Sequence, residues 1–157
     1  MPTDLLYRII DEPRGSAWRA WVVKPFWPWI ALMLGGVWVG VPWFIFNSIA
    51  MGSPSRTREV VAAAALPLVL GGSIFGMVLL ADVLGMPRVT FKYFVLPGIL
   101  FKMVIGYLLF MWQSRAFELH HHFGNPARNG AIIAVAAFFL RERVLAALPD
   151  LLRLSLL

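Results

Sequence analysis

The chain has 157 residues, of which 60% are hydrophobic and only 14% are charged, with 14 Lys and Arg against 8 Asp and Glu. Ordinary soluble domains are roughly 45–50% apolar and about 25% charged. A chain this short cannot hide so much apolar surface from water. The composition therefore excludes an intrinsically disordered chain and argues against a soluble globular domain. Because the chain has no cysteine, a disulfide framework, a thiol nucleophile and a thiolate metal site are excluded as well.

The segment 1–24 mixes acidic and basic side chains and lacks the short apolar core of a secretory signal. Trp18 and Trp21 alternate there with Arg19 and Lys24. Aromatic rings and basic groups together are typical of a segment that lies among lipid headgroups. We therefore expect an amphipathic segment on the membrane surface.

Three apolar runs follow, and each is long enough to cross a bilayer as a helix, which takes about 20 mostly apolar residues. They cover 25–51, 60–81 and 93–112. The first run contains no charge and has tryptophans near both ends, which is typical of interfacial aromatic belts. Since only helices and closed barrels pair all their backbone groups in lipid, the runs predict three transmembrane helices.

A fourth apolar stretch is interrupted by the charged run Arg141-Glu142-Arg143. Extended over 130–148, it predicts a shorter fourth crossing whose charges snorkel to the interface or face a protein partner. The tail over 149–157 has leucines on one helical face and charges on the other, which predicts an interfacial amphipathic segment.

The basic residues indicate the orientation of such a bundle. With four crossings, nine Lys and Arg lie on the side of the two termini and four lie on the other side, whereas three crossings give no bias. Cytoplasmic loops carry the excess of basic residues, so both termini are expected in the cytoplasm and the His-rich loop outside. The expected protein is a single-domain, all-α integral membrane bundle over 1–157. The abundance of Arg, Ala, Leu and Gly suggests a bacterial inner membrane.

Lys102 is the sharpest anomaly because it lies near the middle of the third apolar run. A lysine at that depth costs about 2.5–3.5 kcal/mol on insertion scales, and an intramembrane ionisable residue is a functional-site hypothesis by default. Its candidate partners are Asp82, Asn47 and Ser73. The lysine snorkels to the interface, contacts a partner subunit, or lines a path for transport or protons.

Glu118 and the run His120-His121-His122 form the one cluster with metal-ligand chemistry in the sequence. If the third helix continues, Glu118, His121 and His122 share a face, and two histidines with a glutamate can hold zinc with one open position. An interfacial polar cap and a pH-sensitive contact are the other interpretations of this cluster. No other cofactor is expected.

Small residues recur with G-x-x-x-G spacing in the first two runs, as Gly36 with Gly40 and Gly72 with Gly76. Missing side chains let helices approach closely, so that van der Waals packing drives their association in lipid. Either the two helices pack against each other within the chain, or one of these faces binds another molecule.

Several familiar chemistries are missing from the sequence. It has no P-loop, no dinucleotide-binding turn and no nucleophile elbow, and its basic residues follow the membrane edges rather than a nucleic-acid surface. We therefore expect a non-catalytic inner-membrane protein whose partners are the lipid bilayer and another membrane protein or a second copy. It would act through helix–helix contacts as an accessory or assembly subunit or as an immunity-type partner that neutralises a toxin, with Arg141, Glu142 and Arg143 as partner contacts.

Two other functions stay open at this point. A small ion- or proton-coupled channel or transporter would use Lys102 and Asp82, with prolines breaking its helices. A metal-dependent membrane enzyme would use Glu118 and His120-His121-His122.

Overall fold

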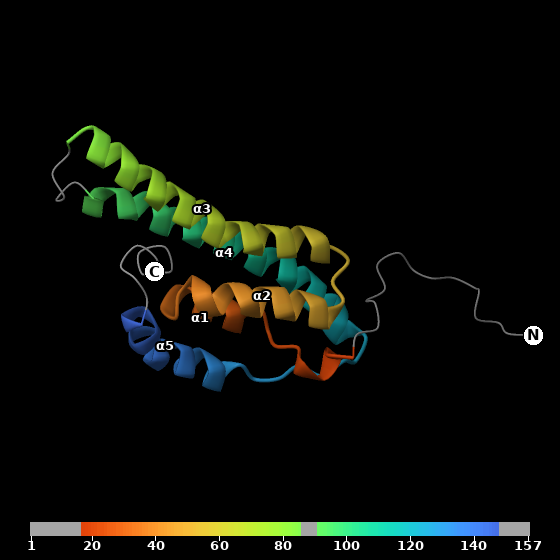
Figure 1. Ribbon diagram of the computed structural model, residues 1–157. Helices are drawn as coiled ribbons and strands as arrows, with labels where there is room; N and C mark the ends of the chain where they lie inside the picture. Colours follow the sequence, from red (N-terminus) through yellow and green to blue (C-terminus); the bar gives the residue numbers. More distant parts are fainter. Residues whose placement is uncertain (1–16, 86–90, 148–157) are drawn as a thin grey trace, which may run out of the picture.

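The structure is a computed structural model that describes residues 17–85 and 91–147, with the backbone alone described at 91–95, 142, 144 and 145. Over these ranges the chain is all-helical apart from one isolated bridge (Figure 1). The amphipathic segments expected over 1–16 and 149–157 lie outside the described residues. The elements are a short 3₁₀ helix η1 (Arg19–Trp21), α1 (Phe26–Leu34), α2 (Val37–Met51), α3 (Arg56–Val83), α4 (Phe91–His122) and α5 (Ala131–Ala146).

The expected single helix over 25–51 is instead two helices that fold back on each other. The chain reverses at Gly35-Gly36, where Gly36 has φ 92° and ψ 180°, a conformation that glycine adopts without steric cost. After the turn α2 runs back along α1, so that a Cβ added to Gly40 would lie 2.4 Å from the Cβ of Leu32. Apolar composition alone does not distinguish one crossing from two shorter helices, and the glycine pair provides the break.

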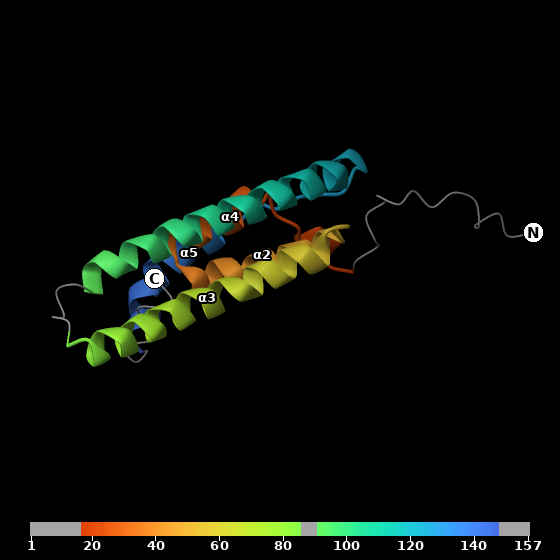
Figure 2. The same ribbon diagram turned by 90° about the horizontal axis from the view of Figure 1, so that it is seen from above.

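The helices α3 and α4 form a long antiparallel pair beside this hairpin. They contain 28 and 32 residues, which correspond to roughly 42 and 48 Å at 1.5 Å per residue. Two helical stretches, Arg56–Val83 and Leu96–His122, are long and apolar enough to cross a membrane. The α3–α4 pair extends past the turn of the α1–α2 hairpin (Figure 2).

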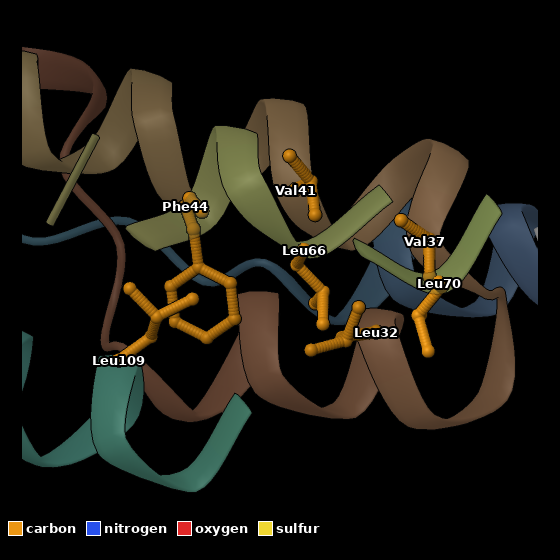
Figure 3. Close-up of a cluster of buried hydrophobic side chains, with 8 residues drawn as sticks. Leu32, Val37, Val41, Phe44, Leu66, Leu70 and Leu109 are labelled. Atoms are coloured by element: carbon orange, nitrogen blue, oxygen red, sulfur yellow. The ribbon is translucent and has the colours of Figure 1, made fainter. Parts of the chain in front are cut away.

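The main core lies where the hairpin meets this pair. Figure 3 shows Val37, Val41 and Phe44 of α2 against Leu66 and Leu70 of α3, with Leu32 of α1 and Leu109 of α4 completing the cluster. The spacing of these residues along α2 and α3 follows the three-to-four-residue period of a buried helix face.

The last helix, α5, packs on α1 through small residues. Ala134 shares a buried cluster with Ala31 of α1 and Trp43 of α2. Ala137 lies close to Gly35, since a Cβ added to that glycine would be 3.1 Å from the Ala137 Cβ. Thus α5 covers the turn of the hairpin.

The outward faces of α3, α4 and α5 carry large apolar side chains in the open. Exposed apolar faces of this extent are typical of surfaces that contact lipid or another protein. The most exposed include Leu68, Phe75 and Val83 on α3, Leu96 and Val104 on α4, and Ile132 and Phe139 on α5.

The segment before α1 and the loop after α4 lie together, at what we call the proximal end of the molecule. There the Arg128 N–H donates to the Val22 carbonyl at 2.7 Å, and Arg128 Nε donates to the Ala20 carbonyl at 2.9 Å. The Arg128 guanidinium also lies 4.2 Å from the centre of the Trp21 ring.

These contacts correct the expected topology. Residues 17–24 and the loop after α4 lie at the same end of the molecule, and not at opposite ends as one helix over 25–51 would place them, because 25–51 folds back on itself. The count of nine basic residues on one side and four on the other assumed one continuous helix over 25–51. That count therefore no longer supports an orientation.

Candidate functional site

Lys102 lies at the level of the hairpin turn. Its side chain is buried, with 6% of its surface exposed. One turn further along α4, Gly106 lies against Leu32, because a Cβ added to that glycine would be 2.7 Å from Leu32 Cδ2. Leu32 is three residues before Gly35, so the lysine and the turn are at the same height in the bundle. Arg141 of α5 is close enough to repel the Lys102 charge.

The structure does not bring Lys102 and Asp82 together. Leu70 lies beside Gly98, with 3.7 Å between Leu70 Cδ2 and a Cβ added to that glycine. Because α3 and α4 are antiparallel, Lys102 is then level with Leu66, about 16 residues or roughly 24 Å along α3 from Asp82. Asp82 is exposed at the far end of the molecule. A channel that uses both residues would need the Asp82 carboxylate near Lys102, and the structure places the two at different levels of the bundle.

The other two candidate partners of Lys102 make hydrogen bonds elsewhere. The Ser73 hydroxyl donates to carbonyls of its own helix, at 2.6 Å for Val69 and 3.0 Å for Leu70. The Asn47 side chain accepts from the Val23 N–H at 3.0 Å and donates to Gln113 Oε1 at 3.1 Å.

The first glycine pair is used within the chain. Gly36 forms the hairpin turn, and Gly40 contacts Leu32 so closely that a Cβ would meet its Cα at 2.5 Å. This pair therefore joins α1 to α2, and its surface is not presented to another molecule.

The second glycine pair lies on an exposed face of α3. In the part of the chain that the structure describes, nothing lies within 4 Å of a Cβ added to Gly72 or Gly76. Exposed apolar side chains of Leu68, Phe75 and Leu79 flank the pair along the same helix. We call this surface the Gly72/Gly76 face. The two G-x-x-x-G motifs do not pack against each other.

The histidine run is divided between the inside and the outside of the molecule. His120 is fully buried, whereas Glu118, His121 and His122 are exposed. The helix does continue through His122. Even so, within 17–85 and 91–147 no three His, Cys, Asp or Glu side chains are close enough together to hold a metal ion.

The loop after α4 folds over His120. The Asn125 N–H donates to the His120 carbonyl at 3.4 Å, and Asn125 Nδ2 donates to the same oxygen at 3.1 Å. The exposed His122 ring meets Phe123 edge-on, with the ring centres 5.8 Å apart. In this arrangement the histidines belong to the packing of the proximal end.

The charged run on α5 is only partly described. Arg141 is half-buried and Arg143 is exposed. The side chain of Glu142 lies outside the described part of the chain. These residues follow the stretch of α5 that covers the hairpin turn.

A buried amide network was not anticipated from the sequence. Besides the two bonds of Asn47, Gln113 Nε2 donates to the Phe44 carbonyl at 2.7 Å. The network joins α2 and α4 to the segment before α1. Its signal in the sequence is weak: Asn47 lies within an apolar run, but Gln113 is followed by the polar residues Ser114 and Arg115.

Glu59 forms a second buried polar cluster at the start of α3. Its Oε1 accepts from the hydroxyls of Ser53 and Ser55, each at 2.6 Å, and only 1% of the residue is exposed. The positive end of the helix dipole also favours a carboxylate in the first turn. The cluster fixes the connection between α2 and α3.

The chain matches no family model, no curated protein and no solved structure. Its function must therefore be inferred from its own residues.

Proposed function

We propose that this chain is an integral membrane protein that works by packing the Gly72/Gly76 face of α3 against a transmembrane helix of another protein or of a second copy. The observation that carries the proposal is the open space at Gly72 and Gly76, where no atom of the described residues lies within 4 Å of an added Cβ. In lipid, close approach of backbones at small residues is a main source of helix association. This face offers such an approach to a partner.

In the proposed topology, α3 and α4 cross the bilayer, and the α1–α2 hairpin enters from the proximal end and returns to it. A chain reversal within the membrane is tolerated only where protein covers it. Gly35 and Gly36 are both buried, which supports this placement. The 16 residues of α5 reach only about 24 Å, so α5 covers the turn without a full crossing of its own.

The basic residues favour a cytoplasmic proximal end. Six Lys and Arg belong to the described segments 17–24, 52–58 and 113–130, which meet at that end, against two in 84–95, which covers the connection and the start of α4. Since cytoplasmic segments are enriched in Lys and Arg, we place the N-terminal segment and the His-rich loop together in the cytoplasm of a bacterial-type inner membrane.

The test is association of the full chain in mild detergent. The double substitution Gly72→Leu with Gly76→Leu adds bulk where the partner helix must approach, so we expect at least a tenfold loss of complex. Cross-linking in membranes, followed by size-exclusion chromatography with light scattering, measures the complex. Ala136→Leu on an exposed position of α5 is the control and leaves association unchanged.

Two results would contradict the proposal. One is a chain that stays monomeric in membranes and co-purifies with no other membrane protein. The other is a complex that persists in the double glycine variant, which would place the interface elsewhere on the molecule.

A further inference from the structure

A groove of about 330 Å³ lies where α2 ends and α3 begins, on the outside of the bundle. Its lining comes from Ile49 of α2 and from Arg56, Thr57, Val60 and Val61 of α3. Its volume is within the range of ligand-binding clefts, about 300–1,000 Å³. Neither the amide network nor the Gly72/Gly76 face includes these residues.

The groove has one polar end and one apolar wall. Arg56 and Thr57 are the first two residues of α3, and both are exposed. Val60 is one turn further along the helix, roughly 6 Å from Arg56 at 1.5 Å per residue. The apolar side chains are open as well, with 39% of Ile49 and 62% of Val61 exposed. The polarity therefore changes along the helix axis, as it does from headgroup to hydrocarbon in a bilayer.

The electrostatics at the polar end favour an anion. The N-terminus of a helix carries a partial positive charge and open N–H groups. The Ser55 hydroxyl makes no capping bond to α3 because it donates to Glu59 instead, and the Arg56 N–H donates to the Ser53 carbonyl at 3.1 Å. The Glu59 carboxylate is buried, its Oε1 accepts from both serines, and the lining of the groove does not include it. The Arg58 guanidinium is 4.2 Å from the centre of the Trp112 ring, so Arg56 is the cation that lines the groove.

We propose that this groove binds one anionic phospholipid. Its phosphate lies against Arg56, Thr57 and the first turn of α3, and an acyl chain runs along Val60, Val61 and Ile49. Basic pockets beside transmembrane helices bind anionic lipid headgroups, and Arg56 supplies the basic group here. The site is separate from the Gly72/Gly76 face.

The experiment is native mass spectrometry of the full chain, released from mild detergent with phosphatidylglycerol or phosphatidylcholine added. We expect discrete phosphatidylglycerol adducts on the wild-type protein and few phosphatidylcholine adducts. Arg56→Gln lowers phosphatidylglycerol occupancy at least fivefold. Arg115→Gln, which removes another exposed basic residue at the same end, leaves it unchanged. Val61→Trp fills the groove and lowers occupancy without removing a charge.

Two outcomes would overturn the lipid site: equal binding of the two lipids, or equal losses in the Arg56→Gln and Arg115→Gln variants, which would reduce the effect to diffuse surface charge. Displacement of the lipid by millimolar inorganic phosphate alone would make the site one for phosphate rather than for phospholipid. Unchanged melting temperatures show that the variants are folded. Because adducts are counted on the single chain, the result does not depend on the association proposed above.

Discussion

Two glycines in helices of this protein show how much the surroundings of a residue decide its role. A Cβ at Gly40 would lie 2.4 Å from the Cβ and 2.5 Å from the Cα of Leu32, so the backbone of the neighbouring helix would have to move. A Cβ at Gly72 would meet nothing within 4 Å among residues 17–85 and 91–147 as described. Each glycine belongs to its own G-x-x-x-G motif. Gly40 is a packing contact between two helices of the chain, whereas Gly72 lies on an open surface.

We expect Gly40→Ala to destabilise the protein by about 1–3 kcal/mol, the usual cost of overpacking a tight interior. Gly72→Ala should be neutral or gain up to about 1 kcal/mol, since alanine is the better helix former. Thermal unfolding in detergent, followed by tryptophan fluorescence, measures both. Equal melting temperatures for the two variants would mean that α1 and α2 do not touch at Gly40.

The buried polar side chains also depend on partners that are distant in the sequence. Asn47 and Gln113 are 66 residues apart in the chain, and each supplies the partner that the other needs in an apolar interior. Lys102, by contrast, was visible from the sequence because a charge in an apolar run is costly. The sequence identified which residue was out of place, and the structure showed its depth and its neighbour Arg141.

At the scale of elements, the α1–α2 hairpin is the feature that changes the architecture. Helix α1 ends just before Gly35-Gly36 and α2 begins just after it. The Gly35 N–H donates to the Ala31 carbonyl at 2.8 Å, and the Gly36 carbonyl accepts from the Gly40 N–H at 3.1 Å. The turn is covered by α5 through Ala137 and is level with Lys102 on α4. The hairpin is therefore held by its neighbours as well as by its own glycines.

Gly36→Ala tests the hairpin directly. Gly36 has φ 92°, and a side chain in such a conformation costs of order 1–3 kcal/mol. We expect a lower midpoint when the variant is unfolded in mixed micelles of mild detergent and dodecyl sulfate. Gly98→Ala is the control, because its Cβ would make only an ordinary contact of 3.7 Å with Leu70. A Gly36→Ala protein as stable as this control would argue for a continuous helix over 25–51.

At the scale of the whole molecule, the helices are distributed unevenly along the long axis. The helices α1 and α2 lie beside the half of the α3–α4 pair nearest the proximal end, and α5 continues past the hairpin turn toward the other end (Figure 2). The other half of the pair exposes apolar side chains such as Phe75, Leu80 and Leu100. That half includes the Gly72/Gly76 face, so the architecture leaves open the surface that we assign to a partner.

Single-cysteine labelling tests the topology, and the natural sequence contains no cysteine to interfere. A membrane-impermeant maleimide should modify Ala20→Cys and Phe123→Cys from one side of oriented vesicles. It should modify Leu84→Cys, at the end of α3, from the other side. All three positions are exposed. Labelling of Ala20→Cys and Phe123→Cys from opposite sides would show that the α1–α2 segment crosses the bilayer.

The long helices α3 and α4 could be predicted from the sequence because their signal is local. About twenty consecutive apolar residues determine a stretch able to cross a membrane, whatever packs around it. Because these apolar runs are recognisable in the sequence, the charge of Lys102 and the G-x-x-x-G spacing of Gly72 and Gly76 within them could be recognised as well.

Only the tertiary structure decided what the first apolar run does. The hydropathy of an uncharged run with two adjacent glycines is the same whether the run forms one membrane-crossing helix or a hairpin of two shorter helices. The choice depends on contacts with α4 and α5, which lie far away in sequence. The hairpin also brings the loop after α4 beside residues 17–24, because α2 returns the chain to the end of the bundle where α1 starts.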